Sequence, residues 1–512
     1  MKNRPIRIRA AALALFSLTQ PACSQAWLEA DLLIRNATLI SPERAAPLEN
    51  AWVSVSDGRI TALGTGIPAV RANRTINADD GYLIPGLIDS HVHLYHATGL
   101  RARYTDDYAA LYRGYMEQQP RSFLFHGFTT VIELNADAET NARFEAAPLH
   151  PHLVHCGQGI ALSDGFMALE LEGAPVGEAY PGYLIDSYAN GFLPEGANPA
   201  AHTPEAVVAS VVRQGGQCVK LYYEEALWWP GGAPDFRLPS AAIIRDVVAE
   251  AHAANLPVLL HATTPAGHAF ALETGVDILA HGMWEWTGQS FTDANPAAET
   301  ADIARREAGS QIAIQPTIQT IRNTASLFDP GMLEAPQWAD VVPAAYLDYL
   351  RGDAQVQREQ FLAMFGDMIA EGSDAEDMGA AQTAFLDRYK NLIWEMHVEN
   401  AGFLFGSDTA VGGFGWASPP GLAGYWEMRN WVDAGISLPT LFRSLTIDNA
   451  VAFGLADEVG TLEPGKRADL LILRANPLRD VAAYDQIETV ILEGAAIDRA
   501  ALSARSAAGG GQ

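Results

Sequence analysis

Cysteine is scarce in this sequence. Only three cysteines occur in 512 residues, and one of them, Cys23, lies in an N-terminal stretch with the features of a cleaved leader. The remaining two, Cys156 and Cys218, are too few to form the disulfide framework that stabilises small secreted domains. We therefore expect both to be buried free thiols.

Positive charge is scarce too, because 33 Lys and Arg residues stand against 61 Asp and Glu residues, which gives a net charge of −28. A surface this negative repels the phosphates of nucleic acids and of anionic membranes, so neither is expected as a partner. Charge favours neutral or cationic small molecules only weakly and does not identify a substrate.

Long apolar runs are absent, since no segment reaches the about 18 uninterrupted apolar residues of a membrane span. The apolar stretch Ala10 to Leu18 follows four basic residues and precedes the small residues Ser24 and Ala26. This order predicts a signal peptide over residues 1–26 and a periplasmic or secreted protein. Cleavage after Ala26 leaves 29 Lys and Arg against 61 Asp and Glu, a net charge of −32. A lipid anchor at Cys23 and a disordered basic N-terminus are the alternatives.

The two ends of the chain share a pattern of short strands. Residues 31–85 and 457–495 contain short runs of Val, Ile, Leu and Thr, separated by turn signals such as Asp-Gly and Pro-Gly. Such runs are typical of β-strands. Each end is too small to fold alone, so we expect residues 27–85 and 457–505 to pair in one small sheet domain.

The middle of the chain, residues 86–456, alternates strand-like runs with helical patterns such as residues 240–255 and 265–275. Eight runs occur in order: GLIDSHVHL, GFTTVIEL, PHLVHCGQGI, GGQCVKLYY, LPVLLHAT, VDILAHG, QIAIQPTI and AGFLFGSDT. Eight such repeats predict an α/β fold, a closed parallel (β/α)8 TIM barrel. The helix-like pattern of about residues 325–395 predicts a helical insertion that could cap the barrel mouth, and a flexible linker is the alternative.

Two histidines end the first of these runs. Residues i and i+2 of a strand point to one face, so His91 and His93 lie together, with Asp89 on the same side. At the C-terminal end of a barrel strand they would face inward, where barrel enzymes have their active sites. Binding one cation through both removes the cost of burying two unpartnered imidazoles. A chance pair or hydrogen-bonded core histidines are the alternatives.

Three further strand ends carry side chains that bind metals. The fifth run ends in His261, the sixth in His281 and the eighth in Asp408. In a closed barrel these residues converge with His91 and His93. Nitrogen and carboxylate ligands suit Zn²⁺ best, and they also suit Mn²⁺ or Fe²⁺.

Lys220 lies in the fourth run, on the face opposite Val219 and Leu221. Lysine is almost never buried without a partner. An uncharged lysine near cations can react with CO₂ to give a carbamate, N6-carboxylysine, whose two oxygens can bridge two metals. Lys220 is therefore predicted to be the sixth ligand of a two-metal site, and an ion pair with a neighbouring carboxylate is the alternative.

The runs GLIDSHVHL, GFTTVIEL, CVKLYY, LLHATTPAGHAFALETGVDILAHG, GSDT and VGTLEPGKRADLLILRANPLRD together resemble the amidohydrolase superfamily over nearly the whole mature chain. The resemblance is closest to imidazolonepropionase-like and peptidase-like members with two metals. Imidazolonepropionases proper lack a bridging lysine, so Lys220 favours the peptidase-like branch. The resemblance implies a (β/α)8 barrel plus a small β-sandwich built from both chain ends. It also implies His91 and His93 on the more buried metal, carboxylated Lys220 as the bridge, His261 and His281 on the second metal, and Asp408 as a ligand and proton shuttle.

The third run departs from the family pattern. The resembling dipeptidases often carry Gly-Gly-His after this strand, whereas His155 lies within it here. His155 could polarise a substrate carbonyl or be a satisfied core histidine. In the stretch YYEEALWWPGGAPDF, the rings of Tyr222, Tyr223 and two tryptophans could line an apolar substrate site, or pack at the barrel edge or a subunit contact of a homo-oligomer.

The expected reaction is hydrolysis of an amide or peptide-like C–N bond. Two divalent cations about 3.5–4 Å apart can hold one water and lower its pKa from about 15.7 towards neutrality, which makes a bridging hydroxide available. One metal polarises the scissile carbonyl, and Asp408 passes the proton to the leaving nitrogen. A dipeptidase, a carboxypeptidase or an N-acyl amino acid hydrolase fits this chemistry.

Three other functions are alternatives. A cyclic amidine deaminase with one metal would not need Lys220 as a ligand. A lactone, ester or phosphotriester hydrolase could use the same two-metal site. A non-catalytic periplasmic metal-binding protein would bind metal without turnover, although such a protein has no use for Asp408 as a proton shuttle.

Overall fold

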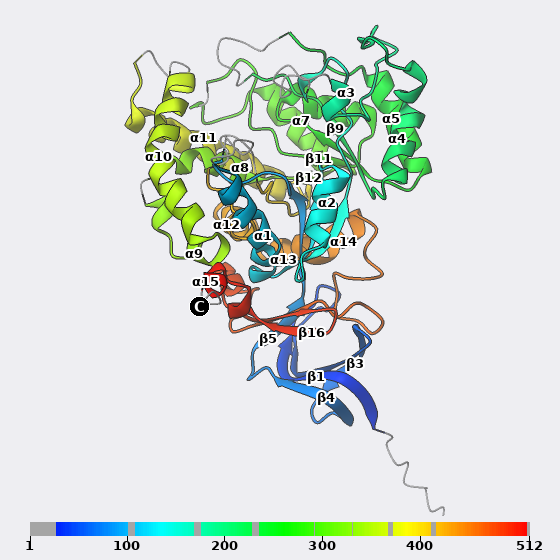
Figure 1. Ribbon diagram of the computed structural model, residues 1–512, viewed down its shortest axis with the longest axis vertical. Coiled ribbons are helices and arrows are strands. Elements are labelled where there is room, and N and C mark those ends of the chain that lie inside the picture. Colours follow the sequence, from blue (N-terminus) through cyan, green and yellow to red (C-terminus); the bar gives the residue numbers. More distant parts are fainter. Residues whose placement is uncertain are drawn as a thin grey trace, which may run out of the picture.

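The computed structural model describes residues 27–100, 108–167, 176–227, 235–290, 292–329, 331–366, 372–410 and 416–508 (Figure 1). The predicted signal peptide, including Cys23, lies outside these ranges. In Figure 1 the strands of both chain ends gather at the bottom, and the parallel strands with their helices lie above them. None of the helices in the described ranges combines the length and the apolar character that crossing a membrane requires.

Both chain ends contribute strands to one hydrogen-bonded sheet. Its eight strands are β1 (Leu28–Leu39), β2 (Leu48–Ser56), β3 (Arg59–Thr65), β4 (Val70–Asn77), β5 (Tyr82–Pro85), β14 (Leu470–Leu473), β15 (Ile487–Leu492) and β16 (Ala495–Asp498). The two ends meet where β5 pairs antiparallel with β14, which sets Leu83 opposite Ile472 in the buried core of the sheet. These strands belong to one sheet, so the sandwich of two sheets is not confirmed.

All eight strand-like runs of the middle region contain strands. They are β6 (Leu87–Val92), β7 (Phe128–Glu133), β8 (His152–His155), β9 (Val219–Tyr222), β10 (Val258–His261), β11 (Ile278–Ala280), β12 (Ala313–Gln315) and β13 (Gly402–Phe403). They pair in parallel, β6 to β8 in a three-stranded sheet and β9 to β13 in a five-stranded sheet. Parallel neighbours bring their C-terminal ends to one edge, where the metal-binding side chains were expected.

Backbone hydrogen bonds link the two parallel sheets at both junctions. Ser90 N donates to Phe405 O at 3.0 Å, and Ile160 N donates to Lys220 O at 2.8 Å. Isolated parallel bridges lie at the same two junctions. The strands nevertheless form two sheets, so a single closed ring of eight strands stays a prediction.

Cys156 and Cys218 form a disulfide, so the expectation of two free thiols is wrong. Cys156 follows β8 and Cys218 precedes β9, and their Cα atoms lie 4.4 Å apart at the second junction. Both residues are fully buried. The fold brings together two cysteines that are 62 positions apart in the sequence, and this proximity is not visible in their number or spacing.

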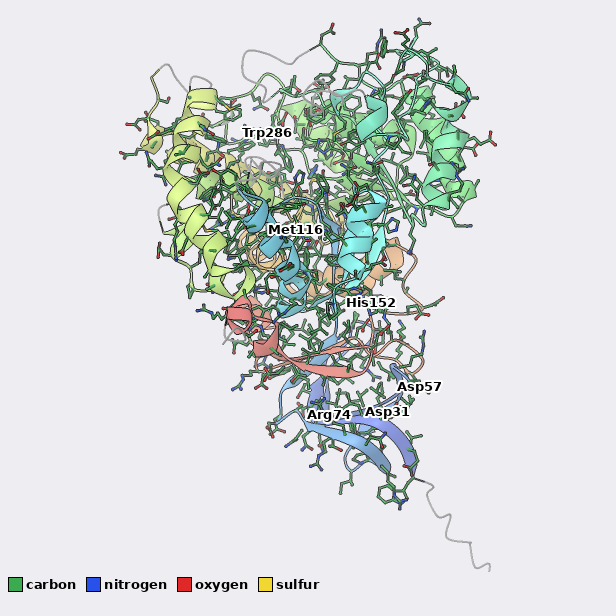
Figure 2. All side chains as sticks on the ribbon, in the orientation of Figure 1. Asp31, Asp57, Arg74, Met116, His152 and Trp286 are labelled. Atoms are coloured by element: carbon green, nitrogen blue, oxygen red, sulfur yellow. A yellow bond between two sulfur atoms is a disulfide. The ribbon has the colours of Figure 1, made fainter. Side chains whose placement is uncertain are left out.

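His152 connects the eight-stranded sheet built from both chain ends, the terminal sheet, to the parallel strands. It begins β8, and its Nε2 lies 3.2 Å from a carboxylate oxygen of Asp469, which precedes β14. Figure 2 shows His152 between the two parts of the molecule. Asp469 also accepts a hydrogen bond from Arg467, so its buried carboxylate has a cationic partner on its own chain segment.

Helices follow most of the parallel strands, and local sequence signals fix where they begin. Ser240 accepts a hydrogen bond from Ile243 N at the start of α5, and Thr264 accepts one from Gly267 N at the start of α6. Both predicted helices, residues 240–255 and 265–275, are thereby confirmed. The helices of this region are α1 (Ala109–Phe125), α2 (Ala138–Glu145), α3 (Val176–Ala179), α4 (Pro204–Arg213), α5 (Ala241–Ala253), α6 (Pro265–Thr274), α7 (Ala298–Ala308), α8 (Ile318–Ser326), α12 (Leu422–Asp433), α13 (Leu438–Arg443) and α14 (Asn449–Ala452), and α15 (Ala504–Ala508) lies near the C-terminus.

The predicted insertion of residues 325–395 is helical in its described residues. It contains α9 (Trp338–Val341), α10 (Ala344–Phe365) and α11 (Ala375–Val398). Tyr389 of α11 is fully buried, and its hydroxyl donates to Pro316 O and accepts from Gly282 N. These two loops follow β12 and β11, so α11 supports the edge at which the strand ends converge.

Candidate metal centre

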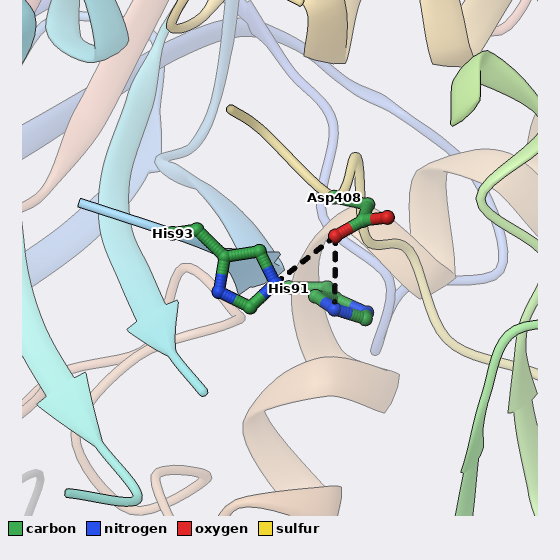
Figure 3. Close-up of side chains that lie close together, drawn as sticks. All are labelled: His91, His93 and Asp408. Carbon is green, nitrogen blue, oxygen red and sulfur yellow. Dashed lines mark ion pairs between the residues drawn. The ribbon is translucent and has the colours of Figure 1, made fainter. Parts of the chain in front are cut away.

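Three predicted ligands, His91, His93 and Asp408, lie in direct contact (Figure 3). A single carboxylate oxygen, Asp408 Oδ1, lies 3.2 Å from His91 Nε2 and 3.1 Å from His93 Nε2. One ligand atom from each residue can be chosen so that all three lie within 4.8 Å of one another. This grouping can hold one cation.

The backbone brings Asp408 to the end of β6. Asp408 N donates to His91 O at 2.8 Å. Asp408 has a φ of 55°, a left-handed conformation that persists only where surrounding contacts enforce it. A side chain at Gly406 would place its Cβ 2.6 Å from His91 Cβ, so the close approach of these two segments requires glycine.

Asp89 holds the segment before Asp408. Its side chain is fully buried, and its two oxygens accept hydrogen bonds from the backbone N–H and the hydroxyl of Ser407. Asp89 Oδ1 also lies 3.3 Å from His91 N. The buried carboxylate of Asp89 therefore joins β6, which carries His91, to the loop after β13 that carries Asp408, the aspartate loop.

The two later histidines continue the row of imidazoles. The ring centroid of His281 lies 5.1 Å from that of His91 and 4.8 Å from that of His261. His91 and His93 have centroids 5.3 Å apart. His281 follows the last residue of β11, and its φ of 106° takes it out of the regular alternation of the strand. All four histidines are thus brought together.

Lys220 lies in β9 with only 2% of its surface exposed. Its Nζ has no hydrogen-bond or ion-pair partner among the described residues, so the alternative of an ion pair with a carboxylate is not observed there. Burial lowers the pKa of Lys220 to about 7. The uncharged amine, which is the form that reacts with CO₂, is therefore accessible near neutral pH.

Several of the buried polar atoms that lack a hydrogen-bond partner are ones that a metal would bind. In the described part of the chain they include both ring nitrogens of His91, Nδ1 of His93 and Nζ of Lys220. Burial lowers the pKa of His91 to about 3, so its imidazole is neutral and keeps a lone pair. Unpartnered buried polar groups are costly, and this donor set fits divalent cations such as Zn²⁺.

His93 and Asp408 form a charged pair at one end of the site. Burial disfavours the charged form of each residue, but the hydrogen bond that His93 donates to Asp408 and the nearby carboxylate of Glu133 raise the pKa of His93 to about 9. For Asp408, the electrostatic interaction with the adjacent His91 and hydrogen bonding to both early histidines outweigh burial and hold the pKa well below its usual value. Asp408 is therefore an ionised acceptor.

Of the predicted substrate contacts, Tyr222 lies beside the metal centre and Tyr223 does not. Tyr222 shares the face of β9 with Lys220, and its ring centroid lies 6.0 Å from that of His261. Tyr223 follows the strand and packs against Phe270 of α6, with ring centroids 4.7 Å apart. Tyr222 alone of this pair is therefore positioned next to a predicted ligand.

His155, the third predicted substrate contact, points away from the row of histidines. It lies on the face of β8 opposite Val154, which packs in the core with residues of the neighbouring strands. Its Nδ1 accepts a hydrogen bond from Gly157 N at 3.1 Å. This contact matches the satisfied histidine of the alternative interpretation. Trp228 and Trp229 lie outside the described residues.

Three residues that contact the histidines were not predicted. The pairs are His93 Nδ1 with Glu133 Oε1 at 3.6 Å, His261 Nε2 with Glu224 Oε2 at 2.8 Å, and His281 Nδ1 with Thr317 Oγ1 at 2.8 Å. Each partner ends a parallel strand or follows it by two residues, as Glu133 does for β7, Glu224 for β9 and Thr317 for β12. Polar residues at strand ends are therefore the signal that could have found them.

The model of the amidohydrolase family matches residues 82–282 and 385–497, which together make up more than half of the chain. The chain belongs to the amidohydrolase family. All six predicted ligands lie within the matched ranges of this amidohydrolase. The family assignment confirms the predicted resemblance and, at the level of the family, the prediction of an enzyme that hydrolyses C–N bonds.

Individual relatives match this amidohydrolase to different extents. L-hydantoinase from Paenarthrobacter aurescens is 31% identical over 104 residues, which is 20% of each chain. The match thus spans about a fifth of that relative's length. Ochratoxinase from Aspergillus niger is 23% identical over 482 residues, covering 90% of this chain and 85% of the relative.

Solved structures of similar proteins share the fold of this amidohydrolase. The crystal structure of A. niger ochratoxinase is 20% identical, covers 92% of this chain and 96% of its own, and has a TM-score of 0.61. A Xaa-Pro dipeptidase with bound methionine is 18% identical, covers 91% and 99%, and has a TM-score of 0.58. These likenesses support the TIM-barrel-like class of fold.

Proposed function

We propose that this amidohydrolase is a periplasmic or secreted enzyme that hydrolyses an amide or peptide-like C–N bond with two divalent metal ions. Zn²⁺ is the metal that we expect. The observation that carries the proposal is the buried Nζ of Lys220, which has no hydrogen-bond or ion-pair partner among the described residues. Its Nζ lies 5.9 Å from the ring centroid of Tyr222, and the ring of Tyr222 lies next to that of His261. An isolated buried ammonium is costly, whereas a carbamate between two cations is compensated.

The six predicted ligands would divide between two cations. His91 and His93 are assigned to the first, His261 and His281 to the second, with Asp408 as a further ligand and carboxylated Lys220 as the bridge. When bound, the cations would polarise the scissile carbonyl and lower the pKa of a water. The chain's own part in this chemistry is to hold the ligands and to move the proton.

Asp408 is suited to move that proton. Its Oδ1 faces the two early histidines, and its Oδ2 accepts a hydrogen bond from Thr320 Oγ1 at 3.0 Å. An ionised carboxylate in this position can take a proton from the attacking water and release it to the leaving nitrogen. Proton delivery matters because an amide nitrogen leaves poorly without it.

Aromatic rings beside the ligands favour a substrate with an apolar group. The ring of Trp284 lies 4.8 Å from that of His281, and the ring of Phe166 is parallel to that of His261 at a centroid distance of 6.4 Å. Tyr222 adds a third ring next to His261. We propose a dipeptide or an N-acyl amino acid with a bulky apolar acyl group, which agrees with the similarity to a Xaa-Pro dipeptidase.

The two parallel sheets are proposed to be two arcs of one (β/α)8 barrel. Backbone hydrogen bonds at both junctions support this closure, and so does the convergence of side chains from β6, β9, β10 and β11. The terminal sheet is proposed to take the place of the β-sandwich.

The disulfide supports the proposed location. Disulfides persist in oxidising compartments and are rare in reducing ones. The buried Cys156–Cys218 bond therefore agrees with a protein that carries a signal peptide and reaches the periplasm or the medium.

The proposal is tested with protein that is purified from the periplasm, stripped by a chelator and reloaded with Zn²⁺, Mn²⁺ or Fe²⁺, with and without bicarbonate. We expect two ions per chain, faster reloading with bicarbonate, and hydrolysis of members of a panel of dipeptides, N-acyl amino acids and aryl amides.

Other outcomes of this experiment favour the alternatives. One ion per chain, with activity retained in Lys220→Ala, would indicate an amidine deaminase. Turnover of lactones or phosphotriesters alone would indicate an ester hydrolase. Tight metal binding with no turnover of any substrate would indicate a non-catalytic protein.

A further inference from the structure

Glu224 is a buried carboxylate in contact with His261. Its Oε2 lies 2.8 Å from His261 Nε2, and only 3% of the residue is exposed. Each of its oxygens also accepts a hydrogen bond from a residue other than His261, Oε1 from Ala226 N and Oε2 from Thr263 Oγ1 at 3.3 Å. A carboxylate held at both oxygens has little freedom to move away from the imidazole.

This contact determines which nitrogen of His261 is available to a cation. With Glu224 Oε2 as the acceptor, Nε2 of His261 would carry the proton and Nδ1 would keep its lone pair. Histidines that bind metals almost always donate their other N–H to a carboxylate, a carbonyl or a water. The Glu224–His261 pair has this form.

The other site histidines are held differently. His281 Nδ1 contacts the hydroxyl of Thr317. Glu133 Oε1 lies 3.6 Å from His93 Nδ1, which is beyond hydrogen-bond distance. Apart from Asp408, Glu224 is the one carboxylate within the described ranges that lies at hydrogen-bond distance from a site histidine.

The charge of Glu224 also has a use at this site. Two divalent cations bring four positive charges, whereas Asp408 and a carboxylated Lys220 bring two negative charges. Uncompensated charge in a buried site is costly. As a carboxylate, Glu224 would supply a further negative charge beside the second cation, acting through the imidazole of His261.

We propose that Glu224 is a positioning residue for the cation bound by His261. It fixes the imidazole with its lone pair on Nδ1 and makes that nitrogen a stronger ligand. The inference rests on the proposed two-metal function, and it assigns part of the affinity for one of the two ions to a residue that does not bind metal.

The test compares Glu224→Ala and Glu224→Gln with the control Glu225→Gln. Glu225 is the next residue, and its carboxylate accepts from Thr264 Oγ1 rather than from His261, so the control removes the same charge without that contact. Zn²⁺ affinities are measured on stripped protein by competition with a chelator, together with ions per chain. We expect Glu224→Ala to weaken one of two ions about 10- to 100-fold, Glu224→Gln to weaken it less because its amide oxygen still accepts, and Glu225→Gln to match wild type.

A second measurement does not depend on metal. Nitrogen NMR of the stripped wild type should show the His261 proton on Nε2, and Glu224→Ala should shift the population towards Nδ1. Unchanged tautomers, unchanged Zn²⁺ affinity in both Glu224 variants, or an equal loss in Glu225→Gln would each overturn the proposal. Fewer than two ions in the wild-type chain, with the expected tautomers, would overturn the two-metal function instead.

Discussion

The two halves of the metal centre are built in different ways. In the early half, His91, His93 and Asp408 contact one another directly, and a backbone hydrogen bond from Asp408 N joins their segments. In the late half, each histidine is held by a side chain that is not a predicted ligand, Glu224 for His261 and Thr317 for His281.

Part of this difference follows from where His91, His93 and His281 lie relative to their strands. His91 and His93 occupy alternate positions of one segment, so strand geometry alone directs them to one point. His281 lies beyond its strand with a φ of 106°, and Thr317 has a φ of 46°, so contacts with neighbours must determine their positions. A backbone change should therefore damage the early half most, and loss of a hydroxyl should damage the late half.

Lys220 should matter to both halves, and its removal is expected to have the largest effect. Lys220→Ala should lose the bridge between the cations, bind fewer than two ions, and lose about 10³-fold in kcat/KM, or about 4 kcal/mol of transition-state stabilisation. Metal analysis and steady-state kinetics check this. The control is Lys390→Ala in α11, where the lysine pairs with Asp433 at 3.8 Å and should leave both values unchanged. A Lys220→Ala enzyme with two ions and full activity would contradict the bridge.

Gly406→Ala should break the early half. The new Cβ would lie 2.6 Å from His91 Cβ, so the aspartate loop must move away from β6. We expect a loss of about 1–3 kcal/mol in the free energy of unfolding of the stripped protein, together with weaker binding of the first ion. The control is Gly402→Ala on the same segment, where the nearest atom lies 3.9 Å away. Equal stability of these two variants would show that the approach of Gly406 to His91 is not tight.

Thr317→Val should damage the late half alone. Valine keeps the shape of threonine but removes the hydroxyl that contacts His281 Nδ1, so we expect about 10-fold weaker binding of the second ion. Thr317→Ser should retain wild-type affinity. Thr324→Val in α8 is the control, because its hydroxyl contacts Gln382 and not a histidine. A comparable loss of affinity in the control would point to α8 as a whole rather than to the hydroxyl.

The same difference explains what could be predicted from the sequence. The eight parallel strands were found because each is a short apolar run between turn or helix signals, and most of the predicted ligands were chosen because they end such runs. His91 and His93 needed only the alternation of a strand. These features are local, and local sequence carries them.

The features that were missed depend on contacts between distant segments. Glu224 precedes His261 by 37 positions, and Cys156 and Cys218 are separated by 62. Their pairing follows from the order of strands across the sheet, not from any local pattern. Predicting which of Tyr222 and Tyr223 lies beside the metal centre would have required knowing the residue at which β9 ends. Predicting that His155 points outward would have required knowing which face of β8 it occupies, and this depends on the register of β8.

The smallest expected effect is the pH dependence of stability due to Glu427. This residue holds the start of α8, directly after Thr317 of the late half. Its carboxylate accepts from Ile318 N at 2.9 Å and from Gln319 N at 2.6 Å. Burial raises the pKa of Glu427 from 4.5 to about 7, although these hydrogen bonds oppose the shift. The folded state therefore holds the proton more tightly, and the free energy of unfolding should fall as pH rises from about 4.5 to about 7, by at most about 3 kcal/mol. Urea unfolding of stripped wild type and Glu427→Gln at pH 4.5, 6 and 7.5 checks this, since the variant cannot ionise. Parallel pH curves for the two proteins would contradict the prediction. A wild-type free energy of unfolding that falls relative to that of Glu427→Gln as pH rises would confirm that Glu427 titrates over this pH range.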